Sequence, residues 1–539
     1  MAAPPVGRLL QELTRVPSRW LSLFAGIFLQ MAYDFTTTYA IITPTLHQDK
    51  NLTVLNLTTV AFIKNIATNF SLLVGLVFFF IISTRRMVPV TCFARFGFIF
   101  TVLLAAVFIF LGYLLIWLDI TDKLKAHKAL YHVFVFCVGH STSIINSANF
   151  TISMMNFSNH HGTVIGLMQG YFHISGSIFM DLNKVFFQGH MGDFLIFMAV
   201  FPPAVSIICS GFIKINPYEN PDNVVERGFR HRFIYSGSVI GLTIVIVGLL
   251  DHFYDFKRSN PWMVVVSDVL LFIAISFPIL VHVWTAAGAP PVVVVAPPPP
   301  SPAAGDEVAR IGLSKIFKSS RFWFLLISSA LATGAYSSLF DNINFFAKPL
   351  KLSEPEVMNI ISISSGLSFL GSLIFGVVSD RALKSHGCGR PWFLTVSTVF
   401  MIGGHIICRF GHLFIGASIV GAFYKHLALL PVIAVELFSL QDCDVVLPAL
   451  EIAKGACSLL LSLSVVFQDK SHKKIHGGCY GKDCFIWSYW SYAIVCLVAF
   501  LLSLILGCLT QQTYLNAQVN LQNEGGGGGG GRGGGGGEN

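Results

Sequence analysis

The stretch GVVSDRALKSHGCGR, residues 376–390, lies between two long apolar runs and gathers charge that the flanking sequence lacks. Its glycine, acidic and basic positions include Gly376, Asp380, Arg381, Lys384 and Arg390. A short charged segment between two apolar runs is typical of a turn that joins two membrane-spanning helices. We therefore interpret this stretch as a short cytosolic loop between two such helices.

The composition of the whole chain indicates repeated burial in lipid. The chain has 539 residues, of which 54% are apolar and 12% charged, whereas a soluble domain is about 25% charged. Its 49 phenylalanines suit helix surfaces that face lipid. The net charge of +8 is modest and forms no basic block interleaved with aromatic residues. We expect the lipid bilayer as a partner, no nucleic acid, and a monomer.

Apolar runs long enough to cross a bilayer recur along the chain, since a spanning helix needs about 20 apolar residues. They lie near residues 20–42, 57–82, 88–117, 130–151, 162–182, 194–213, 233–250, 262–284, 322–346, 357–379, 391–410, 413–438, 446–467 and 485–509. The predicted fold class is all-α: a polytopic membrane protein of about 14 transmembrane helices, arranged as two six-helix bundles with two inserted helices.

This pattern divides the chain into six parts. They are a cytosolic N-terminus (1–19), an N-terminal six-helix bundle (20–213), two inserted helices (214–284), a Pro-rich cytosolic linker (285–321), a C-terminal six-helix bundle (322–509) and a disordered Gly-rich cytosolic tail (510–539). Prolines make the linker a semi-stiff spacer, and the glycine run of the tail cannot form a packed core.

Arginine positions predict the orientation in the membrane. With the N-terminus in the cytosol, every arginine except Arg258 and Arg409 lies in or beside a cytosolic segment, as the positive-inside rule favours. The lysines do not share this bias. This orientation puts residues 376–390 in the cytosol and the segment CYGKDC, with Cys479 and Cys484, outside. A disulfide between these two cysteines is an open prediction, because it requires an oxidising compartment; no metal or cofactor is expected.

The stretch GVVSDRALK resembles the signature loop of the major facilitator superfamily, G-x-x-x-D-R-x-x-[KR], which follows the second helix of each half. Here it follows the second helix after the linker. The counterpart in the first half, STRRMVP at residues 83–89, keeps the arginines but has no acid. The resemblance implies two six-helix bundles that rock about a solute site near the midplane.

A narrower resemblance joins the chain to the plant nodulin-like branch of that superfamily. The stretches that carry it are SRWLSLFAGIFLQMAYDFTTTYAIITP, HGTVIGLMQGYFHISGSIF, FDNINFFAKPL, LLPVIAVELFSL and GKDCF. This branch is similar to oxalate/formate antiporters and monocarboxylate transporters. The chain departs from it at Gln169, where members often have lysine, at His161, where they often have arginine, and at Asn65 and Asn69, where they often have aspartate.

Two groups of residues are predicted to control how the halves approach. Asp380 can accept backbone N–H groups from the N-terminus of a facing helix, and the basic residues of its loop can clamp carboxylates. Glu436 is the predicted partner. Such contacts would exist only while the cytosolic side is shut; the alternative is a simple cytosolic anchor.

The second group is a stripe of glycines that permits close helix approach: Gly162, Gly166 and Gly170.

Polar residues inside the apolar runs are candidates for a substrate or proton pathway, because charge in a membrane usually faces a cavity or a partner. They are Asp34, Lys64, Gln169, His173, Asp341, Lys425 and His426. Gln169 and His173 share a helix face that either lines a cavity or packs between helices. Asp34 and Lys64 are placed to pair. Glu451 and Lys454, three residues apart, are expected to neutralise each other.

The function that follows is secondary active transport of a small-molecule substrate by alternating access. The resemblance implies an organic anion moved together with protons. A non-transporting membrane sensor or scaffold on the same fold is the alternative, which the degenerate loop at residues 83–89 favours. No nucleophile, zinc or nucleotide motif is present, so we expect no catalytic residue and no enzyme. The plasma membrane and an internal membrane such as the vacuole are both compatible with the sequence.

Overall fold

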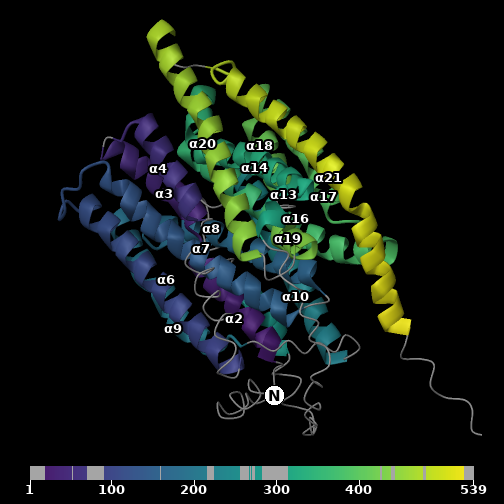
Figure 1. Ribbon diagram of the computed structural model, residues 1–539. Coiled ribbons are helices and arrows are strands. Elements are labelled where there is room, and N and C mark those ends of the chain that lie inside the picture. Colours follow the sequence, from purple (N-terminus) through teal and green to yellow (C-terminus); the bar gives the residue numbers. More distant parts are fainter. Residues whose placement is uncertain are drawn as a thin grey trace, which may run out of the picture.

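The computed structural model describes most of the chain. The described residues are 18–50, 52–68, 90–157, 160–187, 189–214, 224–254, 266, 269, 273–281, 313–424, 428–438, 443–476 and 481–526. Within them the regular structure is helical throughout, without strands. Figure 1 shows two groups of helices side by side, one from each half of the sequence.

The first bundle contains the helices α2 (Ser18–Ala32), α3 (Phe35–Gln48), α4 (Val54–Ala67), α6 (Val90–Ile120), α7 (Leu130–Asn156), α8 (His161–Val185) and α9 (Met191–Ser210). Helix α6 packs on α7 and α9, α4 packs on α7, and α2 packs on α8 and α9. Their facing sides bury apolar residues, which is the main stabilising contact available to helices in lipid besides hydrogen bonds.

The second bundle contains α14 (Ser320–Asp341), α15 (Ile343–Ala347), the 3₁₀ turn η1 (Lys348–Leu350), α16 (Glu354–His386), α17 (Pro391–Arg409), α18 (Leu413–Tyr424), α19 (Leu430–Phe438), α20 (Cys443–His476) and α21 (Ile486–Gly526). Helix α14 packs on α20 and α21, and α17 packs on α18 and α21. The largest contacts between the bundles among the described helices are those of α8 with α16 and of α4 with α20.

Helix α10 (Val224–Tyr254) follows the first bundle and packs mainly on α16 of the second. A Cβ at Gly241 would lie 2.7 Å from the side chains of both Phe369 and Leu370, so the glycine is needed for this approach. Near the start of α10, Phe229 and Phe233 stack on Trp20 of α2. Helix α10 therefore contacts both bundles. The short helix α13 (Leu313–Lys318) precedes the second bundle.

The expected first spanning helix, 20–42, is broken in the structure. Helix α2 ends at Ala32 and α3 begins at Phe35, with Tyr33 and Asp34 between them. The carbonyl of Tyr33, freed by the break, accepts a hydrogen bond of 2.6 Å from the Thr142 hydroxyl of α7. A tertiary partner thus satisfies the backbone at the break, which is how non-helical backbone is tolerated at membrane depth.

Two other boundaries differ from the expectations. Most of residues 376–390 is helix rather than loop, because α16 continues to His386 and ends at Gly387, whose φ of +60° suits a residue without a Cβ. Helix α21 continues to Gly526, so residues 510–526 are helical instead of belonging to a disordered tail. Contacts with the end of α16 hold this extension, since the Gln511 side chain donates to the Gly387 carbonyl at 3.0 Å.

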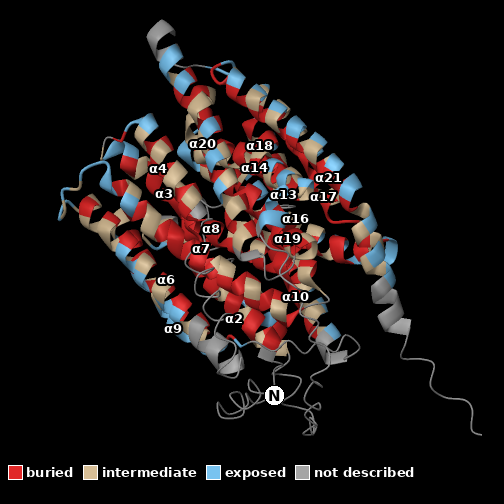
Figure 2. Ribbon diagram, in the orientation of Figure 1, coloured by how far each residue is buried: buried red, intermediate tan, exposed pale blue. Residues whose placement is uncertain are grey.

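Eight described helices are long and apolar enough to cross a membrane. They are segments 98–120, 191–210, 227–254, 320–341, 354–386, 391–409, 445–471 and 486–519. Large apolar side chains such as Val107, Ile207 and Leu460 are exposed on their outer sides, while buried residues fill the centre (Figure 2). This arrangement is that of a multi-pass membrane protein, whereas the number of 14 helices stays a prediction.

Candidate functional site

The end of α16 holds the start of α8. The carboxylate of Asp380 accepts hydrogen bonds from the backbone N–H of Gly162 at 3.1 Å and of Thr163 at 2.7 Å. The hydroxyl of Thr163 donates to the same carboxylate at 2.7 Å. The first N–H groups of a helix have no partner within it, and they carry the positive end of its dipole. Asp380 of the second bundle therefore caps a helix of the first bundle.

Arg390 ties this cap to a second carboxylate. Its guanidinium donates to Asp380 at 2.8 Å, to Glu436 of α19 at 2.7 Å and to the Ser379 hydroxyl at 2.6 Å. The Arg390 side chain is almost fully buried. Burial lowers the pKa of Arg390, but the carboxylates of Glu436 and Asp380 outweigh this effect and raise it above its usual value. The sequence-predicted pair Arg390–Glu436 is present in the structure.

Glycines allow α8 and α16 to touch along their backbones. A Cβ at Gly166 would lie 2.5 Å from the Ser372 carbonyl oxygen, and one at Gly162 would lie 2.6 Å from the Asp380 carboxylate. On the facing helix, a Cβ at Gly376 would collide with the Gly162 carbonyl. The predicted stripe continues to Gly170, where a Cβ would lie 2.6 Å from the Phe369 ring.

Two basic residues of the signature stretch are placed differently from Arg390. Arg381 and Lys384 are exposed at the end of α16. Arg381 makes no ion pair with any described carboxylate, so the expectation that it clamps one is not met. Its position one residue after the buried Asp380 turns it away from the interface, because successive helix positions point about 100° apart.

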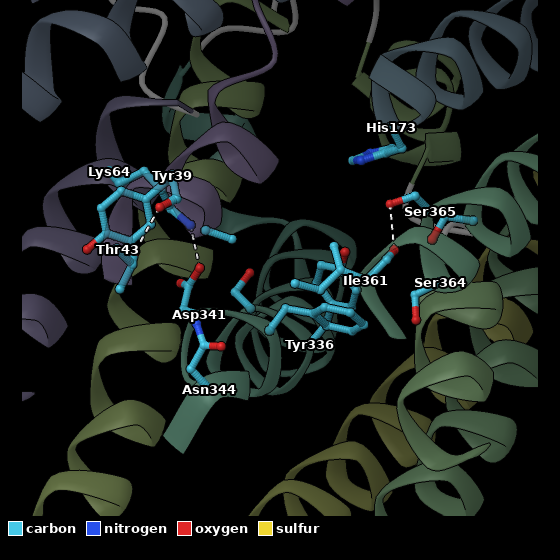
Figure 3. A pocket seen from close by; sticks show the side chains of 14 residues that line it. Tyr39, Thr43, Lys64, His173, Tyr336, Asp341, Asn344, Ile361, Ser364 and Ser365 are labelled. Atoms are coloured by element: carbon cyan, nitrogen blue, oxygen red, sulfur yellow. Dashed lines mark hydrogen bonds and ion pairs between the residues drawn. The ribbon is translucent and has the colours of Figure 1, made fainter. Parts of the chain in front are cut away.

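A central cavity of about 50 Å³ lies between the two bundles. Its lining comes from α3, α4 and α8 of the first bundle and from α14, α15 and α16 of the second (Figure 3). The lining is polar and rich in hydroxyl groups: Tyr39, Thr43, Lys64, His173, Tyr336, Ser337, Asp341, Asn344, Ser364, Ser365 and Ser368. This first cavity is therefore suited to a small polar molecule.

An ion pair crosses the first cavity. The ammonium of Lys64, from α4, donates to the carboxylate of Asp341, at the end of α14 (Figure 3). Lys64 is 1% exposed and the Asp341 side chain 8%. The Asn65 amide donates to the other Asp341 oxygen at 2.7 Å and to the Ser458 hydroxyl at 3.0 Å. Two consecutive residues of the first bundle thus hold one carboxylate of the second.

Asp34 does not take the partner that the sequence suggested. Lys64 pairs with Asp341 instead, because the rotation of α4 directs its side chain across the bundle interface. The Asp34 carboxylate, buried at the break between α2 and α3, accepts a hydrogen bond of 3.2 Å from the Ser175 hydroxyl. Asp34 is absent from the residues that line the described cavities.

A second cavity, of about 130 Å³, adjoins the first and shares His173, Tyr336 and Ser337 with it. Gln169 and His173, the predicted polar face of α8, both line it. So do Glu451 and Lys454 of α20, which pair with each other at 2.6 Å as their spacing suggested. Each of the two lysines at these cavities is therefore already paired with a carboxylate.

A third cavity, of about 450 Å³, lies at the opposite end of α16 from Asp380. It is lined by residues from the end of α3, the end of α8 and the start of α16, among them Pro44, Asp181 and Glu354. Neighbouring residues of α3 and α16 line the first cavity. The third cavity therefore lies near this end of the molecule, and the first cavity lies nearer its centre. At the other end of α16, where Asp380 lies (the Asp380 end), α8 and α16 are in contact.

Some predicted site residues lie outside the described part of the chain. These are Lys425, His426 and Cys479. Cys484 is disulfide-bonded, and its pairing with Cys479 stays a prediction. Within the described ranges, no group of three or more His, Cys, Asp or Glu side chains could hold a metal ion.

The hydroxyl groups that line the first cavity were not predicted from the sequence. Ser364, Ser365 and Ser368 belong to the run ISISSGLS of α16, in which small polar residues recur inside an apolar helix. That recurrence was an available signal for a polar face. Asn65 was noted only as a lost aspartate, although it contacts Asp341 directly.

Comparisons with known proteins agree with this architecture. Residues 19–283 match the family model described as Nodulin-like. No curated protein sequence matches the chain. Among solved structures, the major facilitator superfamily proton:xylose symporter XylE, bound to 6-bromo-6-deoxy-D-glucose, is similar with 12% identity and a TM-score of 0.51; the match covers 90% of this chain and 94% of that chain.

A second solved structure, the xylose transporter XylE from E. coli in a partially occluded inward open conformation, has 11% identity and a TM-score of 0.50. That match covers 90% of this chain and 98% of the other. Such low identity shows the fold alone. The chain has the fold of major facilitator superfamily transporters, and its residues 19–283 match the Nodulin-like family model.

Proposed function

We propose that this protein is a secondary active transporter that moves a small polar solute by alternating access. The observation that carries the proposal is the ion pair between Lys64 and Asp341, which joins the two bundles inside a polar cavity. A buried charge in a membrane protein is costly and usually marks a transport pathway. This pair would be broken and re-formed as the bundles move and the solute binds.

The Asp380 end would be the cytosolic gate. In this state α8 and α16 are held together there by the carboxylate of Asp380 and the guanidinium of Arg390. The third cavity lies at the opposite end of α16, which supports the proposal that this state receives solute from outside the cytosol. Opening toward the cytosol requires that the contacts of Asp380 with Gly162 and Thr163 break. They therefore bias the equilibrium between the two states.

The same ion pair offers a way to couple an organic anion to protons. While Asp341 is charged it occupies Lys64, so a carboxylate of the solute has no free cation to bind. Protonation of Asp341 would remove its charge and release the Lys64 ammonium. The solute carboxylate would then take the place of the Asp341 carboxylate, and solute and proton would cross together.

Uptake into proteoliposomes tests the proposal. Purified protein should accumulate a labelled small carboxylate when the outside is more acidic than the inside, and Lys64→Gln should abolish accumulation. Asp341→Asn should still exchange solute across the membrane but lose the response to the pH gradient. Absence of flux for every carboxylate, together with retained ligand binding, would instead support a membrane sensor on the same fold.

A further inference from the structure

We propose that the solute is an organic acid that carries a hydroxyl or amino group at the end remote from its carboxylate. This inference rests on the proposed function, in which Lys64 binds the carboxylate in the first cavity. It adds that the second cavity binds the remote end through hydrogen bonds that the solute donates. The solute class would then be ω-hydroxy and ω-amino carboxylic acids.

The two cavities are placed to hold the two ends of one molecule. They share His173, Tyr336 and Ser337. Asn65 lines the second cavity while its amide donates to Asp341 of the first. A carboxylate at Lys64 would therefore lie directly beside the second cavity. That cavity, of about 130 Å³, is the larger of the two.

Several residues that line the second cavity carry buried polar atoms without a hydrogen-bond partner. The hydroxyls of Ser143 and Thr333 make no hydrogen bond, although these residues are only 2% and 6% exposed. The side-chain oxygens Oδ1 of Asn146 and Oε2 of Glu451 are buried and unpartnered as well. Buried polar groups in proteins are nearly always hydrogen-bonded. Four such atoms around one cavity, drawn from both bundles, indicate a ligand that supplies their partners.

The chemistry of these atoms selects the kind of ligand. A carboxylate oxygen and an amide oxygen accept hydrogen bonds and cannot donate them, whereas the two hydroxyls can do either. A hydroxyl or ammonium group of the solute would satisfy Glu451 and Asn146. A plain alkyl end would leave them unpaired. A second carboxylate would leave them unpaired as well, because an ionised carboxylate accepts hydrogen bonds and cannot donate them.

A panel of four-carbon acids tests the inference on the purified wild-type protein. Butyrate, 4-hydroxybutyrate, 4-aminobutyrate and succinate have carbon chains of the same length and differ at the remote end. Competition with uptake of labelled 4-hydroxybutyrate should give both ω-substituted acids at least about 10-fold lower inhibition constants than butyrate, because a site with unpaired acceptors rejects an analogue that lacks the donor. Succinate should be the weakest inhibitor.

Two substitutions locate the preference in the second cavity. Ser143→Ala and Thr333→Val remove one unpartnered hydroxyl each with little change of volume, and each should reduce the preference for 4-hydroxybutyrate over butyrate about threefold or more. Ser397→Ala is the matched control. Its hydroxyl is also buried and unpartnered but lies in α17, apart from the cavity linings. It should leave the preference unchanged.

The outcomes separate the two proposals. Equal inhibition by butyrate and 4-hydroxybutyrate, or strongest inhibition by succinate, overturns the inference and leaves carboxylate transport standing. A preference that is unchanged in both Ser143→Ala and Thr333→Val also overturns it. Failure of all four acids to inhibit or to be transported overturns the proposed organic-anion transport and the inference with it.

Discussion

The carboxylate of Asp380 accepts hydrogen bonds from both the backbone N–H and the hydroxyl of Thr163, each at 2.7 Å. The two residues lie on different bundles, at the end of α16 and the start of α8. One side chain of the second half therefore stabilises the first turn of a helix in the other half. This contact holds only in a state in which the two helices touch at this end.

Asp380→Asn should favour a state in which α8 and α16 are separated at the end of the molecule where Asp380 lies. The variant loses the negative charge and places an amide group against the N–H donors of α8, so charge-assisted hydrogen bonds worth about 1.5–3 kcal/mol are lost. A cysteine at Ser147, which lines the second cavity, should then react about 10-fold faster with a membrane-impermeant thiol reagent applied to that end.

The matched control is Arg381→Gln. Arg381 follows Asp380 in the signature stretch but is exposed and pairs with no described carboxylate. Its removal should leave the labelling rate near that of the wild type. Equal rates in Asp380→Asn and wild type would show that the cap on α8 does not control closure.

Neutralising one partner of the central ion pair should destabilise this state more than neutralising both. Lys64→Gln leaves the buried Asp341 carboxylate without its cation, and breaking a buried pair in this way costs about 3–5 kcal/mol. In Lys64→Gln with Asp341→Asn no buried charge remains, so most of the stability should return. Thermal unfolding of the wild type, Lys64→Gln and the double variant in one detergent measures this.

Transport activity should not follow thermal stability across the wild type, Lys64→Gln and the double variant. The double variant has neither a cation for a carboxylate nor a carboxylate for a proton, so it should be folded and inactive. If the double variant unfolds at as low a temperature as Lys64→Gln, the Lys64–Asp341 contact is not the interaction that stabilises this interface.

A larger residue at Gly166 should force α8 and α16 apart. Its Cβ would lie 2.5 Å from the Ser372 carbonyl oxygen, and backbone cannot move aside as a flexible side chain can. Gly166→Val should therefore shift the protein toward the state that is open at the Asp380 end, with faster labelling of the cysteine at Ser147. Gly403→Val is the control, since a Cβ there meets open space. Slow labelling in both variants would contradict the close approach.

The stability of the fold should fall as pH is lowered from about 7 to about 5, partly through His160. Burial, together with the charges of Lys384 and Arg230, lowers the pKa of this residue to about 3. Its neutral ring faces the Arg230 guanidinium. The folded state thus binds no proton at pH 5, whereas the unfolded state, with a pKa of about 6.5, does.

Since only the unfolded state gains this proton, the stability contribution is complete above about pH 6.5. It falls by at most about 1.4 kcal/mol per unit below that pH. His160→Gln should flatten this part of the pH profile of the unfolding temperature. His190→Gln serves as the control, because His190 is exposed in another turn. A profile that is unchanged in His160→Gln would contradict the buried neutral ring.

The sequence by itself determined the class of the protein and several of the residues that join α8 to α16. Runs of about 20 apolar residues identify spanning helices wherever they stand, because crossing the bilayer depends on local length and composition. The order of glycine, acid and base in residues 376–390 identified Asp380 and Arg390, and the acid in VELF supplied Glu436. These features are short local patterns that can be recognised in the sequence alone.

Only the tertiary structure decided what meets across the two bundles. Lys64 lies 277 positions before Asp341, and the rotation of α4 and α14 determined that they pair. The same packing broke the first helix at Tyr33 and Asp34, since Thr142 of another helix satisfies the freed carbonyl. A residue's spacing fixes its face on a helix, but the neighbour of that face depends on how the helices pack. The candidate solute site is made of such long-range contacts.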